Sequence, residues 1–134
     1  LNMYWNIRKM CYNVSLNGDI MAKQKIKVYT NMDNNIESNT FDAILVNNVI
    51  KYIDLVNNMF VIDCSNDILS KENNDTKIVI NFKKNIISIF LKEYNKEFIK
   101  DIETMFINKE EKKYTVKYRL IDEDIINEYQ IEFL

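Results

Sequence analysis

The residues that could do chemistry in this chain are carboxylates, tyrosines, serines and two cysteines, because its 134 residues include no histidine. Without an imidazole there can be no Ser–His–Asp triad, no histidine general base and no histidine-ligated zinc or iron site. With one glycine, Gly18, the chain also lacks the glycine-rich loops that bind phosphates and dinucleotides. Any catalysis would have to rest on carboxylate, phenol or thiol groups.

The densest group of carboxylates is Asp122-Glu123-Asp124, with Glu128 close behind. Such oxygens suit a divalent cation. However, the spacing does not match a calcium-binding loop, which needs spaced ligands, a central glycine and a terminal glutamate. We interpret the group as a solvated hairpin loop and expect neither a metal nor a cofactor.

The candidate nucleophiles lack the residues that would activate them. Cys64 closes the apolar run 59–64 and has no histidine as a base, so we interpret it as a small apolar core residue. Ser65, Ser70 and Ser88 have no glycine-flanked turn around them. We therefore predict that the protein is not an enzyme.

The amino-acid composition limits which partners the protein could bind and in which cellular compartment it is expected. The 18 basic and 20 acidic residues are interspersed and give a net charge of −2, so there is no basic stripe for a nucleic acid. No apolar run is long enough to span a bilayer as a helix. Two cysteines are too few for a disulfide framework, so a reducing cytoplasm is the expectation. The abundance of Lys, Ile and Asn indicates an AT-rich, bacterial genome.

The elements that must position these residues are short strands. Runs rich in Ile, Val, Phe and Tyr alternate with polar residues, which is typical of antiparallel sheets with one dry face. The expected strands cover residues 25–30, 40–46, 49–55, 59–64, 76–82, 86–91, 114–120 and 128–133. Asn pairs at 34–35, 47–48, 57–58 and 73–74 take the place of glycine at the turns. The pattern predicts an all-β antiparallel meander closing into a barrel of about eight strands.

Two segments allow more than one interpretation. In 97–107, Phe98, Ile102 and Met105 follow helical spacing, yet the same stretch also fits a strand. At the N-terminus, residues 1–20 fit either a translated leader before Met21 or a short helix packed on the barrel. In both cases we expect 21–134 to form a single β-barrel domain.

Several local features resemble an uncharacterised family of bacterial calycin-like proteins, related in architecture to the lipocalin barrel and common in low-GC Gram-positive bacteria. The resemblance covers about residues 25–134. It rests on the hairpins joining 49–52 to 60–62 and 77–80 to 87–89, on Tyr94-Asn95-Lys96-Glu97-Phe98, on Ile102-Glu103-Thr104, and on the closing pair 114–120 and 128–133. The family has glycine where this chain has Asn95. The resemblance implies a fold and a cytoplasmic location, and no activity.

Strand alternation and the resemblance together suggest where a ligand would bind. Small barrels either fill their interior with side chains or hold one small ligand there. The aromatic residues expected nearest the interior are Tyr52, Phe82, Phe90, Tyr114 and Tyr118. The leading hypothesis is a non-enzymatic cytoplasmic barrel that binds a small apolar ligand. The alternative is a packed barrel that acts as a protein–protein interaction module, with its oligomeric state left open.

Overall fold

A computed structural model describes residues 12–14 and 20–134, and in this part of the chain every regular element is a β-strand, with turns and loops between the strands. Ten strands, β2 to β11, form a closed antiparallel barrel. The strands are β1 (Tyr12–Val14), β2 (Ile20–Met32), β3 (Asn35–Val46), β4 (Val49–Ile53), β5 (Met59–Asp63), β6 (Ile68–Glu72), β7 (Thr76–Asn81), β8 (Ile86–Leu91), β9 (Lys96–Lys109), β10 (Lys113–Leu120) and β11 (Ile126–Phe133). The predicted antiparallel meander and its closure into a barrel are confirmed.

The chain closes on itself through β2. Strands β3 to β11 follow one another in space as in sequence, β11 then pairs with β2, and β2 pairs with β3 along almost its whole length. β1 pairs with β2 at Ile20–Ala22, beyond the segment that pairs with β11. This closure pairs β2 on both sides, whereas residues 35–43 of β3 are paired with β2 alone.

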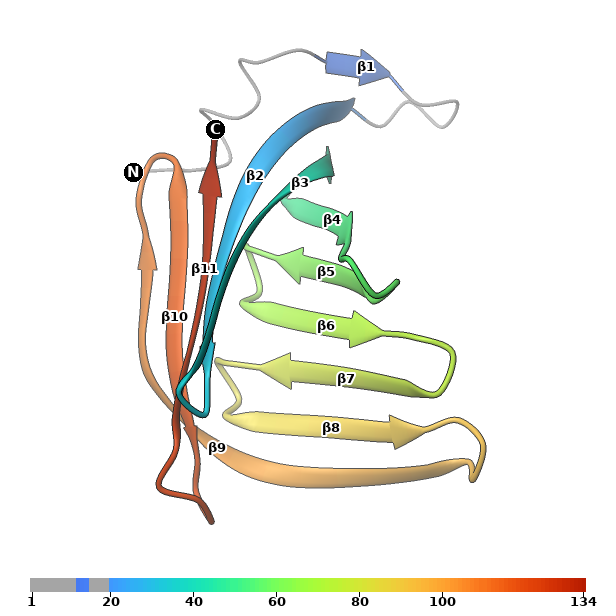
Figure 1. Ribbon diagram of the computed structural model, residues 1–134, viewed down its shortest axis with the longest axis vertical. Coiled ribbons are helices and arrows are strands. Elements are labelled where there is room, and N and C mark those ends of the chain that lie inside the picture. The colour runs from blue at the N-terminus through green and yellow to red at the C-terminus, as the bar shows by residue number, and fades with distance from the viewer. Residues whose placement is uncertain (1–11, 15–19) are drawn as a thin grey trace.

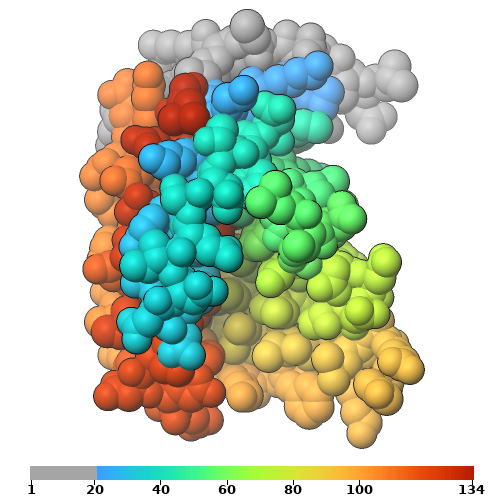
Figure 2. Space-filling model, in the orientation of Figure 1, coloured from blue at the N-terminus to red at the C-terminus, as the bar shows by residue number. Residues whose placement is uncertain are grey.

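The short strands and the long strands build different walls of the barrel. β4 to β8 lie side by side and run across the long strands β2, β3, β10 and β11, while β9 bends from one wall to the other (Figure 1). At one corner of the barrel, the turn between the short strands β7 and β8 contacts β9. There the backbone N–H of Ile102 in β9 donates to the carbonyl of Asn85 at 2.9 Å. At another corner, β4 pairs only with Ile44–Val46, so the rest of β3 borders an opening. The molecule is hollowed there between β3 and the short strands (Figure 2).

Asparagine and aspartate make the turns that glycine makes in other proteins. Positive φ angles occur at the adjacent residues Asp33 (53°) and Asn34 (64°), and also at Asn47 (55°) and Asn57 (63°). Asp33 and Asn34 form a two-residue hairpin between Met32 and Asn35, which requires the left-handed region at both positions. The predicted turn at 47–48 is confirmed, whereas the one predicted at 34–35 lies one residue earlier, at 33–34, and the pair 57–58 belongs to the longer loop between Ile53 and Met59. The fourth pair, 73–74, turns without a positive φ.

Alternation places one face of each strand inside. In β11, Asn127, Tyr129, Ile131 and Phe133 are buried, and Glu128, Gln130 and Glu132 between them are not. On the short-strand wall, one inner row runs directly across five strands and is buried throughout: Ile50, Ile62, Leu69, Ile80 and Ile87. This row forms the apolar floor on which a site can be built.

The barrel has ten strands and not about eight, because two segments were missed. β6 is a short strand whose Ser70, Lys71 and Glu72 conceal the alternation around Leu69. The other is β9, which contains the ambiguous stretch 97–107. The strand alternative is correct there, and the helix is wrong.

Two features of β9 imitate helical spacing. Apolar residues occupy both faces, with Ile102 buried and Phe106 outside near Lys117, whose Nζ lies 5.4 Å from the Phe106 ring centre. Opposite Lys117 and Tyr118 the register shifts, and Met105 is the extra residue. A bulge of this kind moves the next side chains by one position and breaks the period of two.

The predictions for the N-terminus fall mostly outside the described residues. Within 1–19, only Tyr12–Val14 is described, as β1, and β2 begins at Ile20. The leader and the single domain over 21–134 remain predictions.

Candidate ligand-binding hollow

Two adjoining hollows open into the barrel between β3 and the short strands. The first, which we call the aromatic hollow, has a volume of about 220 Å³ and is lined by Val28, Thr30, Glu37, Asn39, Phe41, Tyr52, Asp54, Leu55, Val56 and Phe60. The second, the aliphatic hollow, measures about 290 Å³ and is lined by Thr30, Met32, Glu37, Asp54, Phe60, Leu69, Lys71, Ile78, Ile80, Ile87, Tyr118 and Tyr129. Four residues line both, so the hollows meet at Thr30, Glu37, Asp54 and Phe60.

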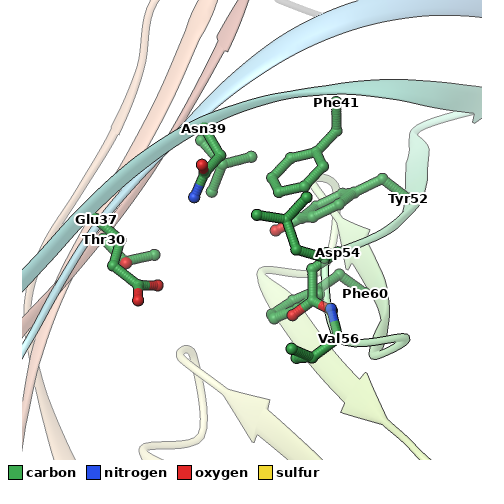
Figure 3. A pocket seen from close by; sticks show the side chains of 10 residues that line it. Thr30, Glu37, Asn39, Phe41, Tyr52, Asp54, Val56 and Phe60 are labelled. Carbon is green, nitrogen blue, oxygen red and sulfur yellow. The ribbon is translucent and has the colours of Figure 1, made fainter.

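A stack of rings forms one wall of the aromatic hollow (Figure 3). Tyr52 and Phe60 are direct partners across β4 and β5, and their rings lie parallel, with centres 4.9 Å apart. Phe41 from β3 stacks on the other side of Tyr52 at 5.0 Å. Strand pairing aligns Tyr52 with Phe60, and Phe41 joins the stack from the part of β3 that is not paired with β4. Such ring contacts stabilise by more than their area alone.

The stack leads to a buried pair of hydroxyl groups. The phenol of Tyr52 is hydrogen-bonded to that of Tyr129 from β11, on the facing wall. Both side chains are almost completely buried. Burial raises the pKa of Tyr52, and the hydrogen bond with Tyr129 offsets part of this rise. Burial also raises the pKa of Tyr129. Both phenols are therefore neutral at physiological pH and satisfy each other.

The β4–β5 loop forms a lip of the aromatic hollow. Oδ1 of Asp54 accepts hydrogen bonds from the backbone N–H groups of Val56 at 3.0 Å and Asn58 at 2.8 Å. Partial burial tends to raise the pKa of Asp54. The hydrogen bond from the Asn58 side chain and the two backbone bonds outweigh this effect, so the pKa is lowered. The loop is thus held in one shape while Leu55 and Val56 stay 78% and 73% exposed.

Charged groups of both signs lie around the hollows. Glu37 stands on the β3 wall and Asp54 on the facing wall (Figure 3). Lys71 lines only the aliphatic hollow, and its Nζ lies 5.9 Å from the ring centre of Phe60. The site therefore combines an aliphatic floor, aromatic walls and a charged rim, a combination that suits an amphipathic small molecule.

The five residues predicted to lie nearest the interior occupy three different places in the structure. Tyr52 lines the aromatic hollow and Tyr118 the aliphatic one. Phe82 and Tyr114 are buried in the core and line neither hollow. Phe90 alternates with Ile87 and Ile89, which pack in the core, so it lies on the outer face of β8 and its placement inside is wrong.

Sequence reasoning missed several lining residues, chiefly Glu37, Phe41, Asp54, Phe60 and Lys71. Phe60 lies opposite Tyr52 because five residues, 54–58, connect Ile53 to Met59, whereas a two-residue turn at 57–58 would have placed Leu55 opposite it. Glu37 and Phe41 carry no local signal either, since their position follows from the length of the β2–β3 hairpin.

A second polar group lies apart from the hollows and serves the fold. Asp67 is 4% exposed, accepts a hydrogen bond from the Tyr114 hydroxyl at 3.0 Å and forms an ion pair with Lys109 at 3.0 Å. It joins the β5–β6 turn to β9 and β10. Nearby Cys64 is buried, which raises its pKa to about 12 despite Lys109, so it is a poor nucleophile.

The carboxylates at 122–124 are exposed, and Oδ1 of Asp124 lies 4.0 Å from Nη1 of Arg119. No group of three or more His, Cys, Asp or Glu residues in the described part of the chain is placed to hold a metal ion. Over the same residues, the structure contains no helix with the length and apolar character needed to cross a membrane. Comparison with known proteins found no matching family model, no matching curated protein and no matching solved structure.

Proposed function

We propose that this barrel is calycin-like and binds a small apolar ligand in the two hollows, without catalysing a reaction, in the cytoplasm of a bacterium. The observation that supports the proposal is that the aromatic and aliphatic hollows meet at four shared residues. Together they reach the scale of small-ligand sites, roughly 300–1,000 Å³. A ligand body would replace water against Leu69, Ile78 and Ile80.

A fluorescent apolar probe tests the proposal. 1-N-phenylnaphthylamine should bind with a saturable rise in fluorescence. Ile78 faces the aliphatic hollow and Val79 faces outward, so Ile78→Trp should block binding and Val79→Trp should leave it unchanged. Circular dichroism and thermal melts would establish that both variants fold. Equal binding to the two folded variants would refute the proposed site.

A second candidate function, a protein–protein interaction module, is favoured by the apolar residues around the β4–β5 loop. Ile53, Leu55, Val56 and Met59 are all exposed on one hairpin. Exposed apolar groups that adjoin one another are typical of contact surfaces. Native mass spectrometry of the protein purified from its host separates the two candidates: a retained small molecule supports the ligand-binding barrel, and an assembly with an empty barrel supports the module.

A further inference from the structure

The aromatic hollow is negatively charged. Glu37 and Asp54 line it from facing walls, and none of its ten lining residues is a lysine or arginine. Glu37 forms no ion pair or hydrogen bond through its side chain with any other residue that the structure describes. Asp54 accepts three hydrogen bonds from neutral donors of its own loop, and the charge of Lys71, in the adjoining aliphatic hollow, also favours its ionised form and so lowers its pKa. A ligand bound here would meet two carboxylates, of which Glu37 is exposed and Asp54 is partly buried.

The ring stack adds to the same preference. The faces of Phe and Tyr rings attract cations, and the attraction strengthens where water is excluded. Phe60, which separates the two hollows, already has an ammonium group near it, because Lys71 Nζ lies 5.9 Å from its ring centre on the aliphatic side. Tyr52 covers the other face of Phe60 and lies between it and Phe41, so the outer face of Phe41 is the ring face left for a cationic head group away from Lys71.

We infer, on the basis of the proposed function, that the ligand is an amphipathic cation. Its ammonium head would lie between Glu37 and Asp54 against the Phe41–Tyr52–Phe60 stack, and its apolar body would extend over Thr30 and Phe60 into the aliphatic hollow. The opposite class, an amphipathic anion with its head on Lys71, would place its charge near the same two carboxylates, which line both hollows.

Three probes with the same eight-carbon chain test this inference: octyltrimethylammonium, octanol and octyl sulfate, each titrated by calorimetry into the full chain. We expect the cation to bind about tenfold more tightly than the alcohol, and the sulfate more weakly than the alcohol. High salt should reduce the preference for the cation, because the carboxylates lie at the rim. Octanol binding should not respond to salt.

Glu37→Gln is the informative variant, because its side chain has no described partner whose loss would disturb the fold. It should weaken octyltrimethylammonium binding about threefold and leave octanol binding unchanged. Glu111→Gln is the matched control: Glu111 is exposed in the β9–β10 turn, outside both hollows. It should alter neither affinity.

The outcomes separate this inference from the proposed function. If all three probes bind equally, the hollow binds apolar chains and the inferred preference for cations is wrong. If octyl sulfate binds most tightly, the inference is also wrong, and Lys71 becomes the head-group site. If no probe binds but the naphthylamine does, the inference again fails. If nothing binds at all, the proposed function fails as well.

Discussion

The hydroxyl groups of Tyr52 and Tyr129, 77 residues apart in the chain, are hydrogen-bonded to each other inside the barrel. Tyr52 belongs to the wall of short strands and Tyr129 to the wall of long strands. Their bond therefore connects the two walls where the ring stack meets the aliphatic hollow. Each hydroxyl satisfies the other in a place that is almost inaccessible to water, so the pair matters for stability as well as for the shape of the site.

Removing one hydroxyl of this pair should destabilise the protein more than its own bond suggests. Tyr129→Phe leaves the Tyr52 phenol buried without its partner and should lower the free energy of unfolding by about 1–3 kcal/mol. Tyr52→Phe should do the same, and the double variant should cost clearly less than the two singles added together. Urea unfolding measures all three. Additive losses would mean that the hydroxyl groups do not depend on each other, and Tyr94→Phe, at a residue 65% exposed, is the control.

Alkaline pH should weaken the fold. Burial raises the pKa of Tyr118 to about 12, against a hydrogen bond from Asn127, and that of Cys64 also to about 12, from ordinary values of 10.0 and 9.0. The folded state thus holds these groups neutral, and the unfolded chain loses their protons first. Stability should be complete below about pH 9 and fall steadily as the pH rises toward 12.

Urea midpoints measured from about pH 8 to about pH 11 would check this dependence. Tyr118→Phe should make the decline shallower, because one buried phenol is removed. A midpoint that stays constant over this range would show that the phenols titrate as readily in the folded protein as in the unfolded one.

Cys64 should resist thiol reagents while the protein is folded. Its raised pKa leaves almost no thiolate near pH 8, and burial denies the reagent access. In a Cys11→Ser background, a chromogenic disulfide reagent should react slowly with the native protein and fully after urea is added. Rapid labelling of the native protein would mean that the barrel opens frequently at the β5–β6 turn.

The β2–β3 hairpin should depend on the residue type at Asn34, whose φ of 64° lies in the left-handed region. Asn34→Ala should cost about 1 kcal/mol of stability, whereas Asn34→Gly should cost nothing or stabilise slightly. Asn74→Ala provides a matched control, because Asn74 is exposed in a turn without a positive φ. Thermal melts of the three variants would measure the effect. Equal losses at both positions would contradict the argument.

Several parts of the fold could be predicted from local pattern. β8 was predicted with its full bounds, and β10 and β11 nearly so, because alternation along one strand needs only that strand's residues. The turns at 34, 47 and 57 were predictable for a similar reason, since asparagine tolerates the left-handed region. β9 could not be predicted from local pattern, because its bulge and its exposed first residues remove the alternation that identifies a strand.

The sequence by itself determined that the chain forms antiparallel strands, where most of them turn, and that Tyr52 and Tyr118 point inward. Only the tertiary structure decided that ten strands close, that Tyr52 bonds to Tyr129, and that Glu37 faces Asp54 across a hollow. The physical reason is that alternation is set by successive residues of one strand. Closure depends on long-range register and on the bend of β9, which no local pattern encodes.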